Sequence, residues 1–392
     1  MVDARSRLRI GAFLGLLALL FVHQRAQLLP RLPLAGEETK VELAPLTLGG
    51  WWSGKFQSAY ERWLPRRLRL RGWLVRLDNQ IGMTLFRQPP SSGTPIVLGR
   101  GGMLFEKAYV DEYNRPRRIT PQGVEKVVGS LERLDALLRR RGSRLVVVVA
   151  PGKPEIYPEL LPPRHVVPGR EQRRSRYQAL APALRRSEVA LVDAVALLRR
   201  ERERGDTPVF ARGGTHWNHY ANAVLAGRLL ATLEREAPGR FVQIRVDGSR
   251  TDSTVWGADD DLGSLLNLFW PRPWPGPQTH PVFERQAEGR RPPRLLFTGD
   301  SFSLQFLTFM TEEGLMEPGE SLYYFNRRIQ HPGGGSVPFD RKTFDAPREI
   351  EGMDAVVLVT SDQNAGELGF GFVEAAIRDL EQEQPPGEGG RR

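Results

Sequence analysis

Four short apolar runs constrain the fold of this chain more than any other feature of its sequence. They are Leu145–Ala150, Val189–Val192, Leu295–Thr298 and Ala355–Thr360, and none of them alternates polar with apolar residues. Runs of this kind, rich in valine and leucine, are typical of strands that are covered on both faces. Because segments with helical periodicity separate the runs, the pattern predicts an α/β fold with a mainly parallel sheet and flanking helices.

A serine follows the third run, in the sequence Thr298-Gly299-Asp300-Ser301-Phe302-Ser303. In open parallel sheets, chemistry collects at the carboxyl ends of the strands. A serine in a tight turn between a buried strand and a helix exposes its hydroxyl beside unpaired backbone N–H groups, which can stabilise an oxyanion. The motif therefore indicates Ser301 as a nucleophile, and the alternative is a simple helix cap, for which Asp and Ser are favoured.

A serine nucleophile needs a base, and the best placed of the six histidines are His216 and His219. Both stand in the segment 212–219, at the start of an expected helix, where a glycine pair allows a sharp turn and Trp217 can fix the loop by packing. We interpret His219 as a helix-surface residue. The two histidines could also share a metal ion, but no third ligand is evident, so no metal site is predicted.

Composition excludes several functional classes. The chain has 392 residues and no cysteine, so disulfides, thiolate nucleophiles, cysteine-based zinc sites and cysteine-ligated iron–sulfur clusters are ruled out. Its formal net charge is +10, but the basic residues are spread along the chain and form no single block. This distribution argues against nucleic acid as a partner.

The N-terminus carries a targeting signal. Arg5, Arg7 and Arg9 precede an uncharged apolar run from Ile10 to Val22, which is short for an ordinary spanning helix. No clear cleavage site follows. We therefore expect an uncleaved signal anchor over residues 1–23 and a Pro/Leu-rich linker over 24–50. The rest of the chain would then lie at the periplasmic face of the inner membrane.

An ordered set of motifs resembles the alginate O-acetyltransferase J/X family of SGNH-hydrolase-like proteins. The motifs are Trp52 to Arg71, the turn Leu98–Phe105, Ala150–Pro154 with Tyr157–Glu159, Gly214–Asn218, Asp261-Leu262 and Gly299–Phe302. The histidine motif precedes the serine motif, a circular permutation of the usual SGNH order. The resemblance implies a three-layer α/β/α domain, which we place at residues 51–382, followed by a disordered tail over 383–392.

The resemblance also assigns roles to residues. Ser301 matches the family nucleophile and His216 the base, whereas the family's aspartate, two residues before the histidine, is here Gly214. An acid that orients the histidine can raise the rate by orders of magnitude. Either another carboxylate takes this role, or a Ser–His dyad works alone, or catalysis is lost. The candidate acids are Asp206, Asp193 and Asp362, and Asn326 is a candidate oxyanion donor.

The function implied by the resemblance is the transfer of an acetyl group, through a serine acyl-enzyme, to hydroxyls of an exopolysaccharide, alginate-like or other. This chemistry needs no metal or nucleotide cofactor. The expected partners are the polysaccharide acceptor and a membrane-bound O-acyltransferase that supplies acetyl. Two alternatives remain open: an acetylesterase that uses the same serine and histidine, and an inactive polysaccharide-binding scaffold subunit.

Overall fold

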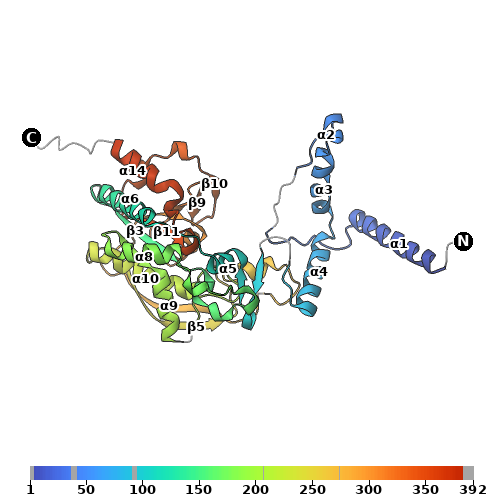
Figure 1. The fold of residues 1–392 in the computed structure, drawn as a ribbon, viewed down its shortest axis with the longest axis horizontal. Helices are drawn as coiled ribbons and strands as arrows, with labels where there is room; N and C mark the ends of the chain where they lie inside the picture. The colour runs from blue at the N-terminus through green and yellow to red at the C-terminus, as the bar shows by residue number, and fades with distance from the viewer. Residues whose placement is uncertain (1–3, 37–41, 91–94, 206, 273, 383–392) are drawn as a thin grey trace, which may run out of the picture. The chain divides into compact units, whose positions relative to one another are not determined.

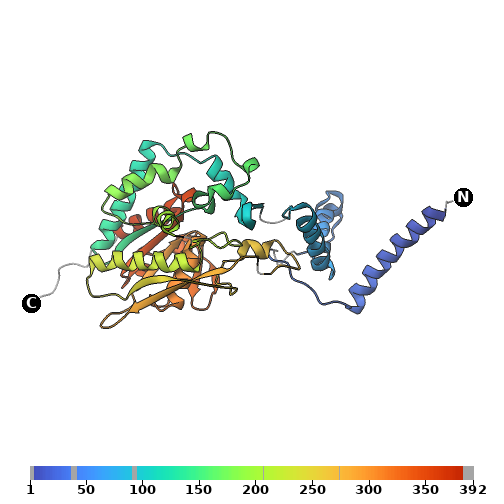
Figure 2. The ribbon, with the colours of Figure 1, turned by 90° about the horizontal axis from the view of Figure 1, so that it is seen from below.

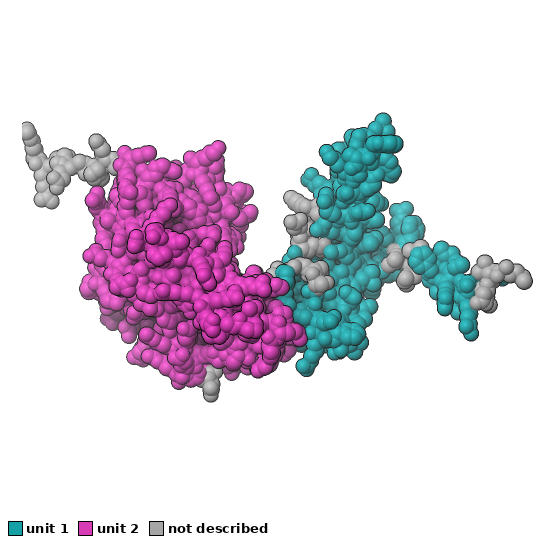
Figure 3. Space-filling model, in the orientation of Figure 1, with its two compact units in different colours: residues 1–96, 263–273 teal, residues 97–262, 274–392 magenta. Residues whose placement is uncertain are grey.

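The computed structural model describes residues 4–36, 42–90, 95–205, 207–272 and 274–382. The chain divides into two compact units, coloured separately in Figure 3. Unit 1 comprises residues 1–96 and 263–273, and unit 2 comprises residues 97–262 and 274–392. Unit 2 carries the sheet and begins at residue 97, whereas the sequence analysis placed the start of one domain at residue 51. The expected tail at 383–392 lies outside the described residues.

A seven-stranded mixed sheet forms the centre of unit 2 (Figures 1 and 2), in the order β10-β9-β8-β7-β11-β3-β4. The strands are β3 (Arg144–Ala150), β4 (Ala190–Asp193), β7 (Leu295–Gly299), β8 (Gly319–Tyr323), β9 (Arg327–His331), β10 (Ser336–Pro338) and β11 (Ala355–Ser361). The five strands from β8 to β4 are parallel, and β9 and β10 add an antiparallel edge. The α/β prediction is confirmed, and the four apolar runs are the adjacent strands β7, β11, β3 and β4.

Helices cover both faces of this sheet. Alternate residues of each strand point to opposite faces, so Val146 and Val148 of β3 pack in one apolar core while Leu145 and Val147 pack in the other. The first core is closed by α10 (His219–Glu236) and α12 (Ser301–Glu312), and the second by α6 (Pro121–Arg139), α8 (Arg176–Arg186) and α14 (Phe372–Gln382).

The remaining elements of unit 2 are small and lie around the sheet. Strands β5 (Gln243–Asp252) and β6 (Gln278–Gln286) pair antiparallel and contact α10. The others are β1 (Ile96–Leu98), β2 (Leu104–Glu106), α5 (Lys107–Asn114), α7 (Lys153–Ile156), α9 (Ala194–Arg204), α11 (Asp261–Leu265) and α13 (Ala346–Ile350). At the boundary between the units, β1 includes one residue of unit 1 and α11 includes three.

Unit 1 is helical. It contains α1 (Ala4–Ala26), α2 (Leu48–Trp52), α3 (Lys55–Arg67) and α4 (Arg71–Phe86). The later segment 263–273 also belongs to this unit. Two buried side chains of α4 hold that segment: Arg76 donates to the Leu268 carbonyl (3.0 Å) and Asn79 to the Leu266 carbonyl (2.9 Å). Among the described residues, no helix combines the length and the apolar character that crossing a membrane requires.

Candidate active site

The turn between β7 and α12 is built for close approach to the neighbouring strand. Gly299 has φ +150°, and a Cβ there would lie 1.8 Å from the carbonyl oxygen of Val359 in β11, so only glycine fits. The buried carboxylate of Asp300 caps α12 through the Phe302 N–H and also accepts the Ser361 N–H (2.7 Å). Asp300 therefore clamps the turn to the end of β11.

Ser301 begins α12 and lies partly exposed at the carboxyl edge of the sheet. Within the described residues, neither its hydroxyl nor its backbone N–H makes a hydrogen bond. A helix start leaves such N–H groups free, and the helix dipole places partial positive charge there. A serine hydroxyl without a partner, beside a free N–H, is an arrangement that can support nucleophilic attack and bind an oxyanion.

His216 is paired with a carboxylate. Its Nδ1 lies 3.0 Å from Asp261 Oδ2, and its Nε2 is buried without a hydrogen-bond partner in the described residues. Because a carboxylate can only accept, Nδ1 carries the proton and Nε2 presents a lone pair, the form that a general base requires. No hydrogen bond joins Nε2 to Ser301 Oγ. Phe302, the next residue after Ser301, packs edge-on against the histidine ring at 4.8 Å between centroids, which brings the start of α12 against the loop of His216.

The loop that carries His216 is fixed by its neighbours. Trp217 is fully buried and packs against Phe302 and Phe306 of α12, at centroid distances of 4.8 and 6.0 Å. Asn218 caps α10 by accepting the Ala221 N–H and donates to the Pro208 carbonyl. The expected packing role of Trp217 is confirmed.

Three consecutive aspartates each hold a different segment of this region. Asp261 binds His216 and also accepts the Thr215 N–H (2.7 Å). Asp260 accepts the Trp274 N–H, and Asp259 accepts the N–H of His219 at the start of α10. Sequence reasoning quoted Asp261 only as part of a family motif and missed its pairing with His216. The acidic run is visible in the sequence, but no local signal pairs any of its members with His216.

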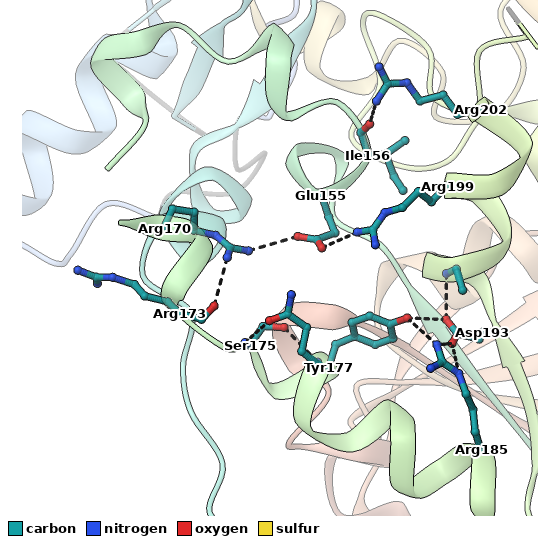
Figure 4. Close-up of polar contacts among 12 residues, drawn as sticks. Glu155, Ile156, Arg170, Arg173, Ser175, Tyr177, Arg185, Asp193, Arg199 and Arg202 are labelled. Carbon is teal, nitrogen blue, oxygen red and sulfur yellow. Dashed lines mark hydrogen bonds and ion pairs between the residues drawn. The ribbon is translucent and has the colours of Figure 1, made fainter. Parts of the chain in front are cut away.

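Asp193, one of the candidate acids named from the sequence, does not contact His216, which corrects that assignment. In Figure 4 the Asp193 carboxylate accepts from the Tyr177 hydroxyl (2.9 Å) and from the guanidinium of Arg185, and it also caps α9. It lies at the carboxyl edge of the sheet but on β4, three strands away from β7, and strands are about 4.8 Å apart. Asp206 lies outside the described residues.

Asp362, the third acid named, follows β11 and accepts the Gln363 N–H. Burial raises its pKa to about 7. A Cβ on Gly152 would lie 3.3 Å from its Oδ1, which places this carboxyl beside the end of β3, and no hydrogen bond joins it to His216.

Gly214 stands where the family has aspartate, and the structure explains why. Its φ is not positive, so the residue is not required by a left-handed backbone. A Cβ at this position would instead lie 2.9 Å from the Ala258 carbonyl oxygen and 3.1 Å from that of Asp259. The backbone that delivers Asp261 therefore occupies the space that a side chain at 214 would need.

A buried lysine anchors the same loop. The ammonium of Lys153, at the start of α7, donates to the carbonyls of Leu104 (2.8 Å), Arg212 (3.3 Å) and Gly214. Burial lowers its pKa to about 7, and the carboxylates of Asp261 and Asp259 oppose that shift. Lys153 is the counter-charge of this acidic cluster and a positioning residue for the loop of His216.

Two tyrosines lie against the turn that carries Ser301. Tyr109 packs edge-on against Phe302 at 6.3 Å, and Tyr324 donates its N–H to the Gly299 carbonyl (2.7 Å). Burial, followed by the nearby Asp300 carboxylate, raises the pKa of both hydroxyls, which keeps them protonated and able to donate. Asn326, named from sequence as an oxyanion donor, is exposed, and its side chain makes no hydrogen bond within the described residues.

His219 is mostly buried, contrary to its interpretation as a surface residue. Its ring stacks on Trp256 at 4.4 Å, and its Nδ1 lies 2.9 Å from Nδ1 of the buried His280, which in turn contacts Asp252 (3.0 Å). Burial lowers the pKa of His219 to about 4. Among the described residues, no group of three or more His, Asp or Glu side chains is arranged to hold a metal ion.

The first prediction concerns Gly214. Gly214→Asp is expected to destabilise the fold by about 1–3 kcal/mol, because its Cβ would press on the backbone of residues 258 and 259. Thermal unfolding measures the effect. Gly129→Ala is the matched control: this glycine lies exposed in α6 with open space around it, so the alanine should be neutral or stabilising. An unchanged melting temperature for Gly214→Asp would contradict the packing explanation.

The second prediction concerns Asp259, whose pKa burial raises to about 8. A carboxyl with a raised pKa in the folded state contributes stability that is fully present below its unfolded value near 4 and is lost as the pH rises through 8. Asp259→Asn mimics the protonated form. We expect the melting temperature of the variant, measured relative to that of the wild type, to be more than about 3 °C higher at pH 8 than at pH 4. A constant difference across this range would show that Asp259 is ionised in the folded protein.

Comparison with known families confirms the family resemblance that the sequence motifs indicated. The family model described as an SGNH hydrolase-like domain of the acetyltransferase AlgX matches residues 96–313. The probable alginate O-acetylase AlgJ of Pseudomonas aeruginosa is 28% identical over 277 residues, which cover 65% of this chain and 66% of that protein. The AlgJ of Azotobacter vinelandii is 26% identical over 187 residues, covering 46% of this chain and 44% of that protein. The chain thus matches just under two thirds, or less, of the length of these relatives.

Solved structures in the same comparison include the O-acetyltransferase domain of Pseudomonas putida AlgJ, with 17% identity and a TM-score of 0.45 over 74% of this chain and all of that one. Bacillus cereus PatB1 aligns with 9% identity and a TM-score of 0.41, covering 70% of this chain and 97% of that one. The family model spans more than half of the chain and includes both His216 and Ser301. The chain therefore belongs to the family of SGNH hydrolase-like domains whose model is named for the acetyltransferase AlgX.

Proposed function

We propose that this protein is a serine-dependent O-acetyltransferase. The observation that carries the proposal is the Asp261–His216 pair, whose Nε2 has no hydrogen-bond partner within the described residues. Phe302, the residue after the unbonded Ser301, packs against the same histidine ring. A nucleophile, a base and an acid that orients the base are the three parts that acyl transfer through serine requires.

The proposed reaction has two halves. His216 Nε2 removes the proton of Ser301 Oγ as the oxygen attacks the carbonyl carbon of an acetyl ester, and the resulting imidazolium is stabilised by Asp261. The Oγ–C bond forms, the ester C–O bond breaks, and the leaving alcohol takes the proton back from His216. A hydroxyl of the acceptor then attacks the acetyl-serine by the same steps in reverse, so no metal or nucleotide is needed.

Charge that develops on the carbonyl oxygen needs donors. The free N–H of Ser301 at the start of α12 is one such donor. We assign the protonated hydroxyls of Tyr109 and Tyr324 as the side-chain candidates, since both flank the turn and neither donates a hydrogen bond within the described residues. They replace Asn326 in this role.

The acceptor that we propose is a hydroxyl of an exopolysaccharide, alginate-like or other, because the relatives are named as probable alginate O-acetylases. The proposed acetyl donor is a partner protein of the membrane-bound O-acyltransferase type. We place the reaction at the periplasmic face of the inner membrane, on the basis of the basic flank and apolar run at the N-terminus.

The alternative of an inactive scaffold rested on the missing family aspartate at 214. Asp261 supports catalysis instead, because it offers His216 the carboxylate that Gly214 does not. An acetylesterase would use the same residues with water as acceptor, and experiment separates it from a transferase.

The third prediction tests the proposed triad. Ser301→Ala should reduce the release of p-nitrophenol from p-nitrophenyl acetate to background. Asp261→Asn should lower kcat by roughly two to four orders of magnitude, because the amide no longer holds the productive tautomer of His216. The matched control is Asp193→Asn, which alters an aspartate that contacts Tyr177 and Arg185 and not the histidine.

Equal losses of kcat in the Asp261 and Asp193 variants would contradict the triad. Circular dichroism of each variant shows whether a loss of activity comes from misfolding. Mass spectrometry adds a second measurement: wild-type protein should gain one acetyl group on Ser301. Addition of an exopolysaccharide should then remove the acetyl group faster than water does if the protein is a transferase. Removal at an unchanged rate would identify an esterase.

The fourth prediction concerns topology. A reporter that is active only after export, fused after Arg392, should be active, because the basic flank before the apolar run retains the N-terminus in the cytoplasm. A reporter that is active only in the cytoplasm should be silent at the same position. The reverse pair of outcomes would refute the proposed location.

A further inference from the structure

We infer that helices α2 and α3 of unit 1 form a surface that binds the headgroup layer of an anionic lipid membrane. The inference concerns a surface outside the candidate active site and stands independently of acetyl transfer. It rests on the exposure of apolar side chains, on an aromatic row along α3 and on the charge of the surrounding sequence.

Exposed apolar side chains are concentrated in unit 1. Among the described residues, all but four of the large hydrophobic side chains that are exposed belong to this unit, and those four are the valines 166, 255, 282 and 337. Trp52 is 92% exposed, α2 buries no residue, and α3 buries only Ala59. A soluble protein seldom leaves so much contiguous apolar surface without a partner.

A continuous aromatic row runs from the end of α2 along one face of α3. Trp51, Phe56, Tyr60 and Trp63 follow one another with ring centroids 6.1, 6.0 and 5.8 Å apart, and the guanidinium of Arg67 lies over the Trp63 ring. Ser58, Glu61 and Arg62 occupy the opposite face by helical spacing. An amphipathic helix with Trp and Tyr on one face and basic residues around it is the type that lies in the interface of a bilayer.

The positive charge of this region favours an anionic partner. Residues 48–71 contain six basic residues and only one acidic residue, Glu61. Basic side chains are attracted to anionic headgroups, and arginine can keep its charge in the headgroup layer while its stem lies against apolar surface. The row suits sugar binding less well, because Phe56 stacks on Tyr60 and Arg67 lies over Trp63, so each of these rings already has one face in contact with a neighbour.

The apolar helix α1 ends at the basic corner between α3 and α4. Gln24 of α1 donates to the Arg67 carbonyl (3.3 Å) and accepts the Arg69 N–H (3.0 Å), and Arg31 donates to the Arg66 carbonyl (2.8 Å). α1 itself exposes Leu8, Ile10 and Phe13. Apolar surface and basic surface therefore adjoin within one unit, as a bilayer interior and its headgroups adjoin.

The absence of cysteine makes a direct test possible, because one introduced cysteine labels one site. The full chain is prepared as Tyr60→Cys, labelled with the polarity-sensitive dye NBD, and mixed with vesicles of phosphatidylglycerol and phosphatidylcholine. NBD emission should rise about twofold or more and should be quenched by brominated lipid. In phosphatidylcholine vesicles, or at high salt, the rise should be much smaller.

Two labelled controls separate this surface from binding through α1 alone. Ser58→Cys lies on the opposite, exposed face of α3, and Val282→Cys is an exposed site of unit 2. Neither should respond. Equal responses at positions 58 and 60, or no response at 60, would overturn the inference. A response at position 60 to soluble alginate in the absence of vesicles would also overturn it, in favour of a sugar-binding surface.

Discussion

The close approach of two backbone segments decides the geometry of the candidate site. The loop before α10 and the acidic run before α11 lie against each other, with the Leu262 N–H donating to the Gly213 carbonyl (2.9 Å). This contact leaves no room for a Cβ at Gly214 and at the same time brings Asp261 to His216. One packing contact thus both excludes a side chain at Gly214 and places the Asp261 carboxylate at His216. The carboxylate that pairs with His216 therefore comes from a different part of the chain.

The same contact concentrates charge in a buried region. Asp259 and Lys153 are shielded from solvent, and burial moves the pKa of the carboxyl up to about 8 and that of the ammonium down to about 7. Lys153 uses its donors on three backbone carbonyls of the surrounding loops, Gly214 among them. These three hydrogen bonds tie β2 and the loop of His216 to the start of α7. The protonation of Asp259 and Lys153 is therefore coupled to the position of the loop that carries His216.

Unit 1 and unit 2 differ in which side chains they bury and which they expose. In unit 2, apolar side chains are buried on both faces of the sheet, and the polar groups gather at its carboxyl edge. In unit 1, polar side chains such as Arg76 and Asn79 make the internal contacts, while aromatic and aliphatic side chains face outward. This inversion is the expected arrangement for a helical segment whose favourable surroundings are partly apolar, and it underlies the membrane surface that we infer.

The sequence by itself determined the strands, the nucleophile turn and the proposed base. Uninterrupted apolar runs, the glycine before Asp300 and the loop before Trp217 are local signals, because strand burial, turn geometry and capping depend on neighbours within a few residues. Only the tertiary structure decided the orienting acid, the reason for Gly214 and the role of Lys153. Asp261 is 45 residues from His216 in the sequence, and Lys153 reaches loops 49 to 61 residues away. No local pattern encodes such pairings, since they arise where the backbone brings distant segments within hydrogen-bonding distance.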